Sequence, residues 1–311
     1  MAPGPQRIYA RPVQTLAQIK AILAQRSLHP KHALGQNFLI DHNLLAKLVD
    51  AAAPAPGELV LEVGPGTGTL TETLLDRGCR VVAVELDDAL ADHLRATLGR
   101  RAGFTLVHGD ALAPGRRLCP PAVHALGDEP FVLVANLPYQ AATPLIMDLL
   151  MRRPLCRALA VTVQREVAQR LAAPPGTKAY GTLSVVAQAL AAPRLIAKLP
   201  PECFWPRPEV TSAMVLLTRL PAPLTATPMA LAQLCQRLFS QRRKQIGSTL
   251  GRATPLPPSV APTQRPEELA PAQLVALLGA LPPGWLSPRA GGDAEPGTPG
   301  GDDLDTADDP R

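Results

Sequence analysis

The chain has 311 residues and a net charge of +5, and its hydrophobic residues (46%) include few aromatics (3%). This length allows one large domain and a smaller one, whereas no apolar run approaches the ~18 residues of a membrane span. Five scattered cysteines without a CxxC pair argue against a disulfide framework and a zinc ribbon, so we expect reduced thiols, no metal site and a cytoplasmic protein.

The first predicted element is a helix over residues 13–25, where apolar side chains recur with helical spacing. It belongs to an N-terminal extension that we place at residues 1–26. A polar, basic loop over residues 27–37 follows. A second helix is expected over residues 44–53, ended by Pro54.

From residue 59 the pattern changes to short apolar runs, which are typical of buried strands, separated by helical stretches. The strands are expected at residues 59–63, 81–84, 104–107, 131–135, 158–164, 194–199 and 213–217. The helices are expected at residues 70–77, 87–98, 165–171 and 183–191. This alternation predicts an α/β fold with a doubly wound, mostly parallel, Rossmann-like sheet, which we place within residues 27–222.

Beyond residue 220 prolines cluster and the strand pattern ends. Helical stretches at residues 229–239, 241–250 and 271–278 predict a small helical domain over residues 223–286. Residues 287–311 are rich in Gly, Pro and Asp, so we expect a disordered acidic tail. This tail holds seven acidic side chains and two arginines, so the rest of the chain carries +10, which favours a polyanionic partner.

A Gly-rich turn, Gly64 to Thr69, follows the first predicted strand. Glycines let the backbone adopt positive φ and approach a ligand closely, at the sheet edge where open α/β folds bind ligands. The sixth position of the dinucleotide fingerprint is Thr69 rather than glycine, and Glu62 precedes the turn. We therefore interpret the turn as a site for a methyl donor that is cationic at sulfur.

Two more carboxylates follow predicted strands. Glu85 ends the second strand, where it can accept hydrogen bonds from ribose hydroxyls, and Asp110 follows the third, where it can accept one from an adenine amine. Each alone could simply cap a helix. Their position at successive strand ends, together with the Gly-rich turn, favours a site for S-adenosyl-L-methionine.

The fourth predicted strand ends in Asn136-Leu137-Pro138-Tyr139. An adenine amine is a poor nucleophile because its lone pair is delocalised into the ring. The Asn136 side-chain oxygen and a backbone carbonyl beside Pro138 can accept both amine hydrogens and favour a pyramidal nitrogen. Pro138 stiffens the loop, and Tyr139 offers a face for base stacking. The alternative is an ordinary strand-to-turn sequence; the position beside a methyl-donor site favours the catalytic interpretation.

With these motifs the chain resembles the KsgA/RsmA family of 16S ribosomal RNA adenine dimethyltransferases, from about Ser27 to Leu281. Further matches are Leu34–Leu39 (LGQNFL), Lys178–Ser184 (KAYGTLS), Phe204–Ser212 (FWPRPEVTS) and Gln241–Lys244 (QRRK). The resemblance implies dimethylation of two adjacent adenosines in a hairpin near the 3′ end of 16S rRNA, late in assembly of the small subunit. The partner would be the immature 30S subunit, and each target base must be flipped out or already unpaired.

The resemblance also implies roles for individual residues. Those expected to contact the methyl donor are Asn37, Leu39, Gly64, Glu85, Asp110 and Asn136. The target base would be held by Asn136, Leu137, Pro138 and Tyr139, with Phe204 on its opposite face. The family usually has a small polar residue where this chain has Trp205. The resemblance therefore does not define the RNA-binding surface at this position.

A basic run in the predicted helical domain is also assigned by the resemblance. Arg242, Arg243 and Lys244 could simply form a solvated helix face, but family membership favours contacts with RNA phosphates. Further candidates for the same surface are Lys31, His32, Arg165 and Lys178.

Two other functions compete with this interpretation. A 23S rRNA adenine dimethylase shares the catalytic loop, although Lys178–Ser184 and Gln241–Lys244 favour the small-subunit family. A non-catalytic RNA-binding or assembly factor could keep the fold, although the intact loop at Asn136 argues against lost activity. Leu137 distinguishes the chain from DNA adenine and glutamine methylases, which prefer Pro-Pro-Tyr after the Asp or Asn. We expect a monomer without membrane association.

Overall fold

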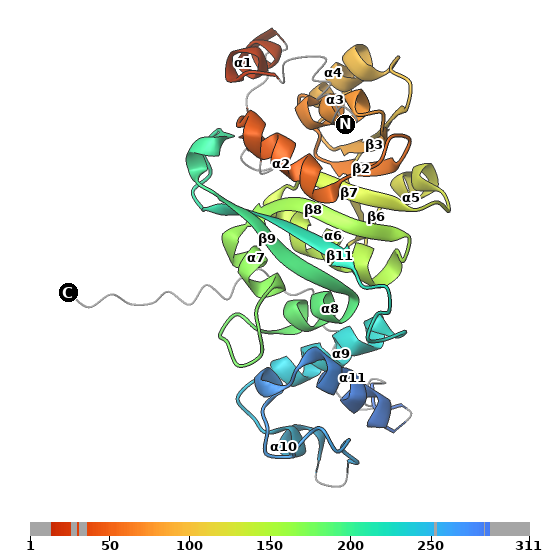
Figure 1. Cartoon of the computed structure of the whole chain (residues 1–311), viewed down its shortest axis with the longest axis vertical. Helices are drawn as coiled ribbons and strands as arrows, with labels where there is room; N and C mark the ends of the chain where they lie inside the picture. The colour runs from red at the N-terminus through yellow and green to blue at the C-terminus, as the bar shows by residue number, and fades with distance from the viewer. Residues whose placement is uncertain (1–13, 26–29, 31–35, 252–253, 283, 287–311) are drawn as a thin grey trace, which may run out of the picture.

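A central sheet dominates the computed structural model, which describes residues 14–25, 30, 36–251, 254–282 and 284–286 (Figure 1). Its seven strands are β2 (Leu59–Val63), β3 (Arg80–Glu85), β4 (Phe104–His108), β7 (Phe131–Asn136), β8 (Cys156–Gln164), β9 (Ala191–Leu199) and β11 (Ser212–Arg219). They lie in the order β4-β3-β2-β7-β8-β11-β9. The strands from β4 to β8 are parallel, and β11 pairs antiparallel with β8 and β9. The predicted fold class is confirmed. The helix expected over residues 13–25 is confirmed as Leu16–Gln25, whereas residues 1–13, Lys31, His32 and the predicted acidic tail lie outside the described residues.

The structure describes helices on both faces of the sheet and further helices outside these two layers. They are α1 (Leu16–Gln25), α2 (His42–Ala52), α3 (Thr69–Asp76), α4 (Asp88–Leu98), α5 (Pro120–Leu126), α6 (Tyr139–Arg152), α7 (Arg165–Leu171), α8 (Thr182–Leu190), α9 (Pro228–Phe239), α10 (Ile246–Leu250) and α11 (Pro271–Ala280). None of these described helices is both long and apolar enough to cross a membrane.

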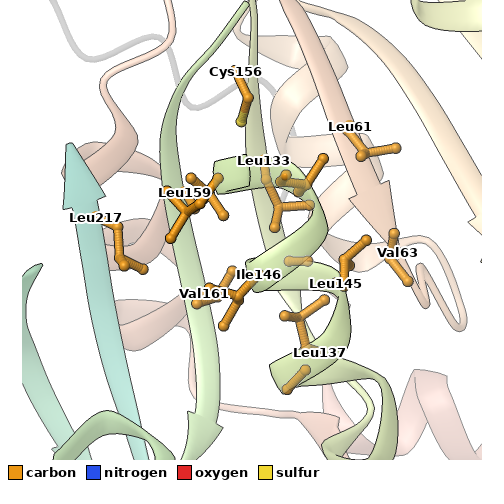
Figure 2. Packing of buried hydrophobic residues seen from close by; sticks show 14 of the residues in the cluster. Leu61, Val63, Leu133, Leu137, Leu145, Ile146, Cys156, Leu159, Val161 and Leu217 are labelled. Carbon is orange, nitrogen blue, oxygen red and sulfur yellow. The ribbon is translucent and has the colours of Figure 1, made fainter. Parts of the chain in front are cut away.

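Alternate residues of the central strands enter two separate hydrophobic clusters. Leu61 and Leu133 pack with side chains of α6, as Figure 2 shows, whereas Val60 and Val132 pack with side chains of α2 and α3 on the other face. Because both faces are buried, the strands are apolar throughout, which is why their positions could be predicted from the sequence.

Two pairs of very short strands lie outside the central sheet. β1 (Phe38–Leu39) pairs antiparallel with β10 (Phe204–Trp205), and β5 (Leu112–Ala113) pairs with β6 (Arg117–Leu118). Neither pair is among the predicted elements, because two residues are too few to show periodicity. The β1–β10 pair brings together two segments that are distant in sequence.

The C-terminal helices form a third cluster together with α8 and the loop before it. Within this cluster the buried Tyr180 hydroxyl donates to the Leu269 carbonyl at 2.8 Å. The prediction of a helix over residues 241–250 is wrong for its first half: α10 begins at Ile246, and residues 241–244 form a turn. The turn has its own backbone bond, from Lys244 N–H to the Gln241 carbonyl at 2.8 Å, and it directs Arg242 back toward residues 177–178.

Candidate active site at the carboxyl edge of the sheet

A cavity of about 600 Å³ lies at the carboxyl ends of β2, β3 and β7. This volume is in the usual range for small-molecule and cofactor sites, roughly 300–1,000 Å³. The structure brings all six residues expected to contact the methyl donor into its lining: Asn37, Leu39, Gly64, Glu85, Asp110 and Asn136. Residues from widely separated parts of the sequence therefore meet around one site.

The Gly-rich turn forms one wall of the cavity and packs closely against two others. Gly64 and Gly66 have φ of 73° and 61°, values that favour glycine. A Cβ atom on Gly64 would lie 3.3 Å from the Pro138 ring, and one on Gly66 would lie 2.8 Å from Cε1 of Phe38. Glycine at these two positions therefore allows the turn, the Asn136 loop and the segment before α2 to converge.

Buried carboxylates face the cavity beside this turn. The Glu85 side chain is 5% exposed, and its two oxygens accept from Gly66 N–H at 3.1 Å and Asp87 N–H at 2.9 Å. Burial raises the pKa of Glu85, and these backbone bonds oppose the rise. Glu62 accepts from the Thr71 hydroxyl at 2.7 Å, and burial raises its pKa to about 8. A nearby cation favours the ionised form of a carboxyl group, so this wall fits a positively charged ligand.

The opposite end of the cavity combines one carboxylate with apolar surface. Oδ1 of the exposed Asp110 accepts from Leu112 N–H at 2.8 Å, which fixes the carboxylate at the end of β4. Leu86, Leu112 and Pro114 line the cavity near it, and Leu86 is 46% exposed. A flat heterocycle with an amine edge suits such a slot, so the chain offers what the adenine of S-adenosyl-L-methionine requires.

The Asn136 loop is fixed from three directions. Nδ2 of Asn136 donates to the Asn37 carbonyl at 2.8 Å. The Leu137 side chain is 2% exposed and packs into the α6 cluster (Figure 2), while its N–H donates to the Thr162 carbonyl at 3.3 Å. Pro138 then caps the start of α6. The bond from Nδ2 to the Asn37 carbonyl fixes the orientation of the Asn136 amide. Its Oδ1 can then accept a hydrogen bond from a ligand.

The two aromatic residues expected to hold the base lie in different environments. Tyr139 is half-buried, and its hydroxyl is 2.5 Å from Oγ of the buried Ser212, so the ring is tied to β11. Phe204 is only 2% exposed and packs in the same cluster as Leu39, its partner in the β1–β10 pair. In this structure Phe204 offers no open face to a base, which departs from the stacking position expected for it.

The predicted phosphate contacts divide into two kinds. The Arg242 guanidinium forms an ion pair with Glu267 and donates to the carbonyls of Thr177 at 2.7 Å and Lys178 at 2.8 Å, so this side chain is used within the fold. Arg243 and Lys244 are exposed in the turn, as are Arg165 and Lys178 elsewhere. The three basic residues therefore lie in a turn rather than on a helix face, and Arg242 differs from the other two in its contacts.

Some residues at the site escaped the sequence analysis. Phe38 lines the cavity and stacks on Trp205, with ring centroids 6.3 Å apart and planes at 22°. Gln14 bonds to the Gly-rich turn from outside the cavity. Phe38 could have been found from the sequence, because it is an aromatic residue beside Asn37 in the family motif. Nothing in the local sequence around Gln14 indicates its contact with the turn.

Comparisons with known proteins show the family of the chain. The protein-family model described as ribosomal RNA adenine dimethylase matches residues 28–275. Ribosomal RNA small subunit methyltransferase A from Paracoccus denitrificans is 40% identical over 286 residues, covering 86% of this chain and 97% of the relative. The protein of the same name from Kineococcus radiotolerans is 42% identical over 234 residues, covering 73% and 75%.

Solved structures show the same fold. The 23S rRNA methyltransferase ErmE is 27% identical, with a TM-score of 0.60 over 79% of this chain and 99% of that one. A dimethyladenosine transferase from Plasmodium falciparum is 21% identical, with a TM-score of 0.63 over 76% and 94%. Because the identity to the Plasmodium falciparum protein is only 21%, this similarity shows a shared fold and nothing more.

Proposed function

The chain belongs to the ribosomal RNA adenine dimethylase family, and we propose that it modifies two adjacent adenosines in the 3′-terminal hairpin of 16S rRNA. It is an S-adenosyl-L-methionine-dependent methyltransferase of rRNA adenines. We place its action on the immature 30S subunit, late in small-subunit assembly. Relatives named small subunit methyltransferase A, with 39–42% identity, support the choice of subunit.

One observation carries the catalytic assignment: the Asn136 amide is held by the Asn37 carbonyl at the wall of the cavity. In the proposed mechanism Asn136 Oδ1 and the Leu137 carbonyl accept the two hydrogens of the adenine amine. This arrangement concentrates the nitrogen lone pair on the side that faces the donor. When bound, S-adenosyl-L-methionine supplies an electrophilic methyl group on a cationic sulfur. Fixed positioning then provides most of the rate acceleration.

Binding and orientation of the donor are assigned to the other cavity walls. Glu85 would accept the ribose hydroxyls and Asp110 the adenine amine, while the buried carboxylates balance the positive charge. Asn37, Leu39 and Gly64 would contact the donor from the remaining walls. Tyr139, anchored through Ser212, would stack on the target base. Arg243 and Lys244 would bind RNA phosphates.

The two rival functions find less support. ErmE, which acts on 23S rRNA, is 27% identical to this chain, whereas the small-subunit relatives reach about 40%. A non-catalytic assembly factor has no need for a formed cavity with an oriented Asn136 amide beside it. The identities therefore favour small-subunit methylation over the first rival, and the cavity with its oriented amide favours an enzyme over the second.

We also infer that the protein acts as a monomer in the cytoplasm. All five cysteines are free thiols, and four of them are buried, which suits a reducing compartment.

The proposed substrate can be tested by incubating the purified chain with methyl-labelled donor and either immature 30S subunits or 23S rRNA. Primer extension should then map two adjacent dimethyladenosines near the 3′ end of 16S rRNA and none in 23S rRNA. Label confined to 23S rRNA would establish the first rival. Absence of label with both substrates, under conditions where the donor binds, would establish the second.

A further inference from the structure

The segment before the first family motif contacts the Gly-rich turn through one glutamine. Nε2 of Gln14 donates to the Thr67 carbonyl at 3.0 Å and to the Glu72 carboxylate at 3.2 Å, and its Oε1 accepts from the Thr69 hydroxyl at 3.1 Å. The nitrogen and the oxygen of the Gln14 amide therefore both form hydrogen bonds with the turn or with the helix that follows it. Thr67 and Thr69 line the cavity and are 3% and 8% exposed.

Helix α1 continues this contact along the outside of the cavity wall. Its Ile19 and Leu23, which are 1% and 3% exposed, form a small cluster with Leu90, and Phe38 and Trp205 pack against it. Leu90 and Phe38 both line the cavity. Helix α1 therefore supports the cavity wall from behind.

Trp205, the residue that departs from the family pattern, is also part of this arrangement. Nζ of Lys20 lies 5.3 Å from the centre of the Trp205 ring, which stacks on Phe38. The partly buried tryptophan therefore packs between α1 and Phe38. We call residues 14–23 the brace, because Gln14 contacts the Gly-rich turn and the first turns of α1 pack against the β1–β10 pair.

We propose that Gln14 is a positioning residue for the methyl donor, and that the brace holds the Gly-rich turn and Phe38 in the donor-binding shape. The turn contains glycines on both sides of Thr67, and glycine-rich backbone loses more conformational freedom when it is ordered than other backbone does. A hydrogen-bonded clamp orders the turn in advance, so less of the binding free energy is spent on ordering it. This inference rests on the proposed function, because it requires the donor to occupy this cavity.

The test compares donor affinity by calorimetry for Gln14→Ala, Gln14→Met and the wild type. Methionine keeps the length of the side chain and removes its hydrogen bonds. Both variants should bind S-adenosyl-L-methionine about five- to twentyfold more weakly. The KM for the donor should rise, while kcat at saturating donor and the KM for RNA stay within about twofold, since the acceptors of the amine are untouched.

A matched control is Gln25→Ala, at the end of the same helix and beyond the brace, because the side chain of this exposed glutamine makes no hydrogen bond to any residue that the structure describes. It should bind the donor like the wild type. Wild-type affinity in both Gln14 variants would overturn the proposal. Normal affinity in Gln14→Met alone would also overturn it, since packing would then suffice.

Glu85→Ala separates this outcome from a failure of the donor site itself. That variant should lose donor binding whatever the brace does. If Glu85→Ala binds normally, the proposed donor site is wrong. If it loses binding while the Gln14 variants keep theirs, only the role of the brace is wrong.

Discussion

The donor edge of the sheet and the C-terminal helices use polar side chains for different purposes. At the donor edge, Glu85 and Asn136 end buried strands, and backbone bonds hold each side chain at the wall of a cavity. Among the C-terminal helices, Tyr180 and Arg242 bond to backbone carbonyls and so join one helix or loop to the next.

This difference shows that a residue in a family motif need not contact a ligand. Lys178–Ser184 and Gln241–Lys244 both carry the family resemblance, yet Tyr180, Ser184 and Arg242 mainly hold the fold together. A polar residue at the end of a parallel strand lies where ligands bind in open α/β sheets. The place of a motif in the fold, more than its similarity, indicates whether it contacts a ligand.

The largest effect is expected at Asn136. Asn136→Ala removes the fixed amide oxygen and should lower kcat by at least about 10²-fold, because the amine is no longer oriented. Affinity for RNA should change little. Single-turnover kinetics and RNA binding measured side by side check this, with the exposed Asn43→Ala as a control. Wild-type turnover in Asn136→Ala would show that this strand-end side chain has no role in catalysis.

A second prediction contrasts two glycines with similar backbone. Gly64 (φ 73°) faces the Pro138 ring, whereas a Cβ on Gly57 (φ 82°) would meet nothing within 4 Å. Alanine at either site costs about 1–2 kcal/mol of folding free energy, because positive φ strains an L-residue. Only Gly64→Ala should also lower kcat/KM, by roughly 10- to 100-fold, since it displaces the Pro138 loop. Equal kinetics in the two variants would show that the contact with Pro138 is unimportant.

A third prediction concerns the pH dependence of stability. Burial raises the pKa of Glu62 from its ordinary 4.5 to about 8, so the folded protein binds this proton more tightly than the unfolded chain does. Stability should therefore decrease as the pH rises from about 4.5 to about 8, by up to roughly 1.4 kcal/mol per pH unit. Glu62→Gln, which stays uncharged, should remove this part of the slope in urea unfolding. An unaltered slope would mean that other groups produce it.

Arg242 provides the corresponding prediction for the C-terminal helices. Arg242→Ala removes the ion pair with Glu267 and two bonds to carbonyls, and should lower the free energy of unfolding by about 2 kcal/mol. The neighbouring Arg243→Ala, which alters an exposed side chain, serves as the control and should leave stability unchanged. Equal unfolding midpoints for the two variants would contradict the structural role of Arg242.

The smallest effect is expected for Arg243 and Lys244 together. Replacing both with alanine should weaken RNA binding about five- to tenfold near physiological salt, and should reduce the slope of log affinity against log salt by about 1 for each residue. Filter binding at several salt concentrations measures both quantities. If the slope is unchanged, these two residues face solvent and the C-terminal helices make no electrostatic contact here.

The sequence predicted the central sheet, and it predicted that the expected donor contacts would meet at one edge of that sheet, for a physical reason. Strands buried on both faces are continuous apolar runs, and the residues that follow them reach one edge of the sheet. Helix α6 was missed because Pro144 lies inside it, where proline normally interrupts a helix.

Contacts between distant segments could not be predicted. The pairing of Leu39 with Phe204 depends on two-residue strands far apart in the chain. Arg242 and Arg243 are chemically identical in the sequence, and their roles differ because Glu267 and the carbonyls of residues 177–178 lie beside Arg242 in the folded chain. The bonds of Gln14 likewise depend on the tertiary structure alone.

The placement of the two tryptophans gives each region its own optical reporter. Trp205 stacks on Phe38 at the donor edge, and Trp285 lies 4.2 Å from the Arg237 guanidinium among the C-terminal helices. In a Trp285→Phe protein all indole emission therefore originates beside the cavity, and in Trp205→Phe it originates beside the C-terminal helices. Intrinsic fluorescence can thus follow the two regions separately, without any attached dye.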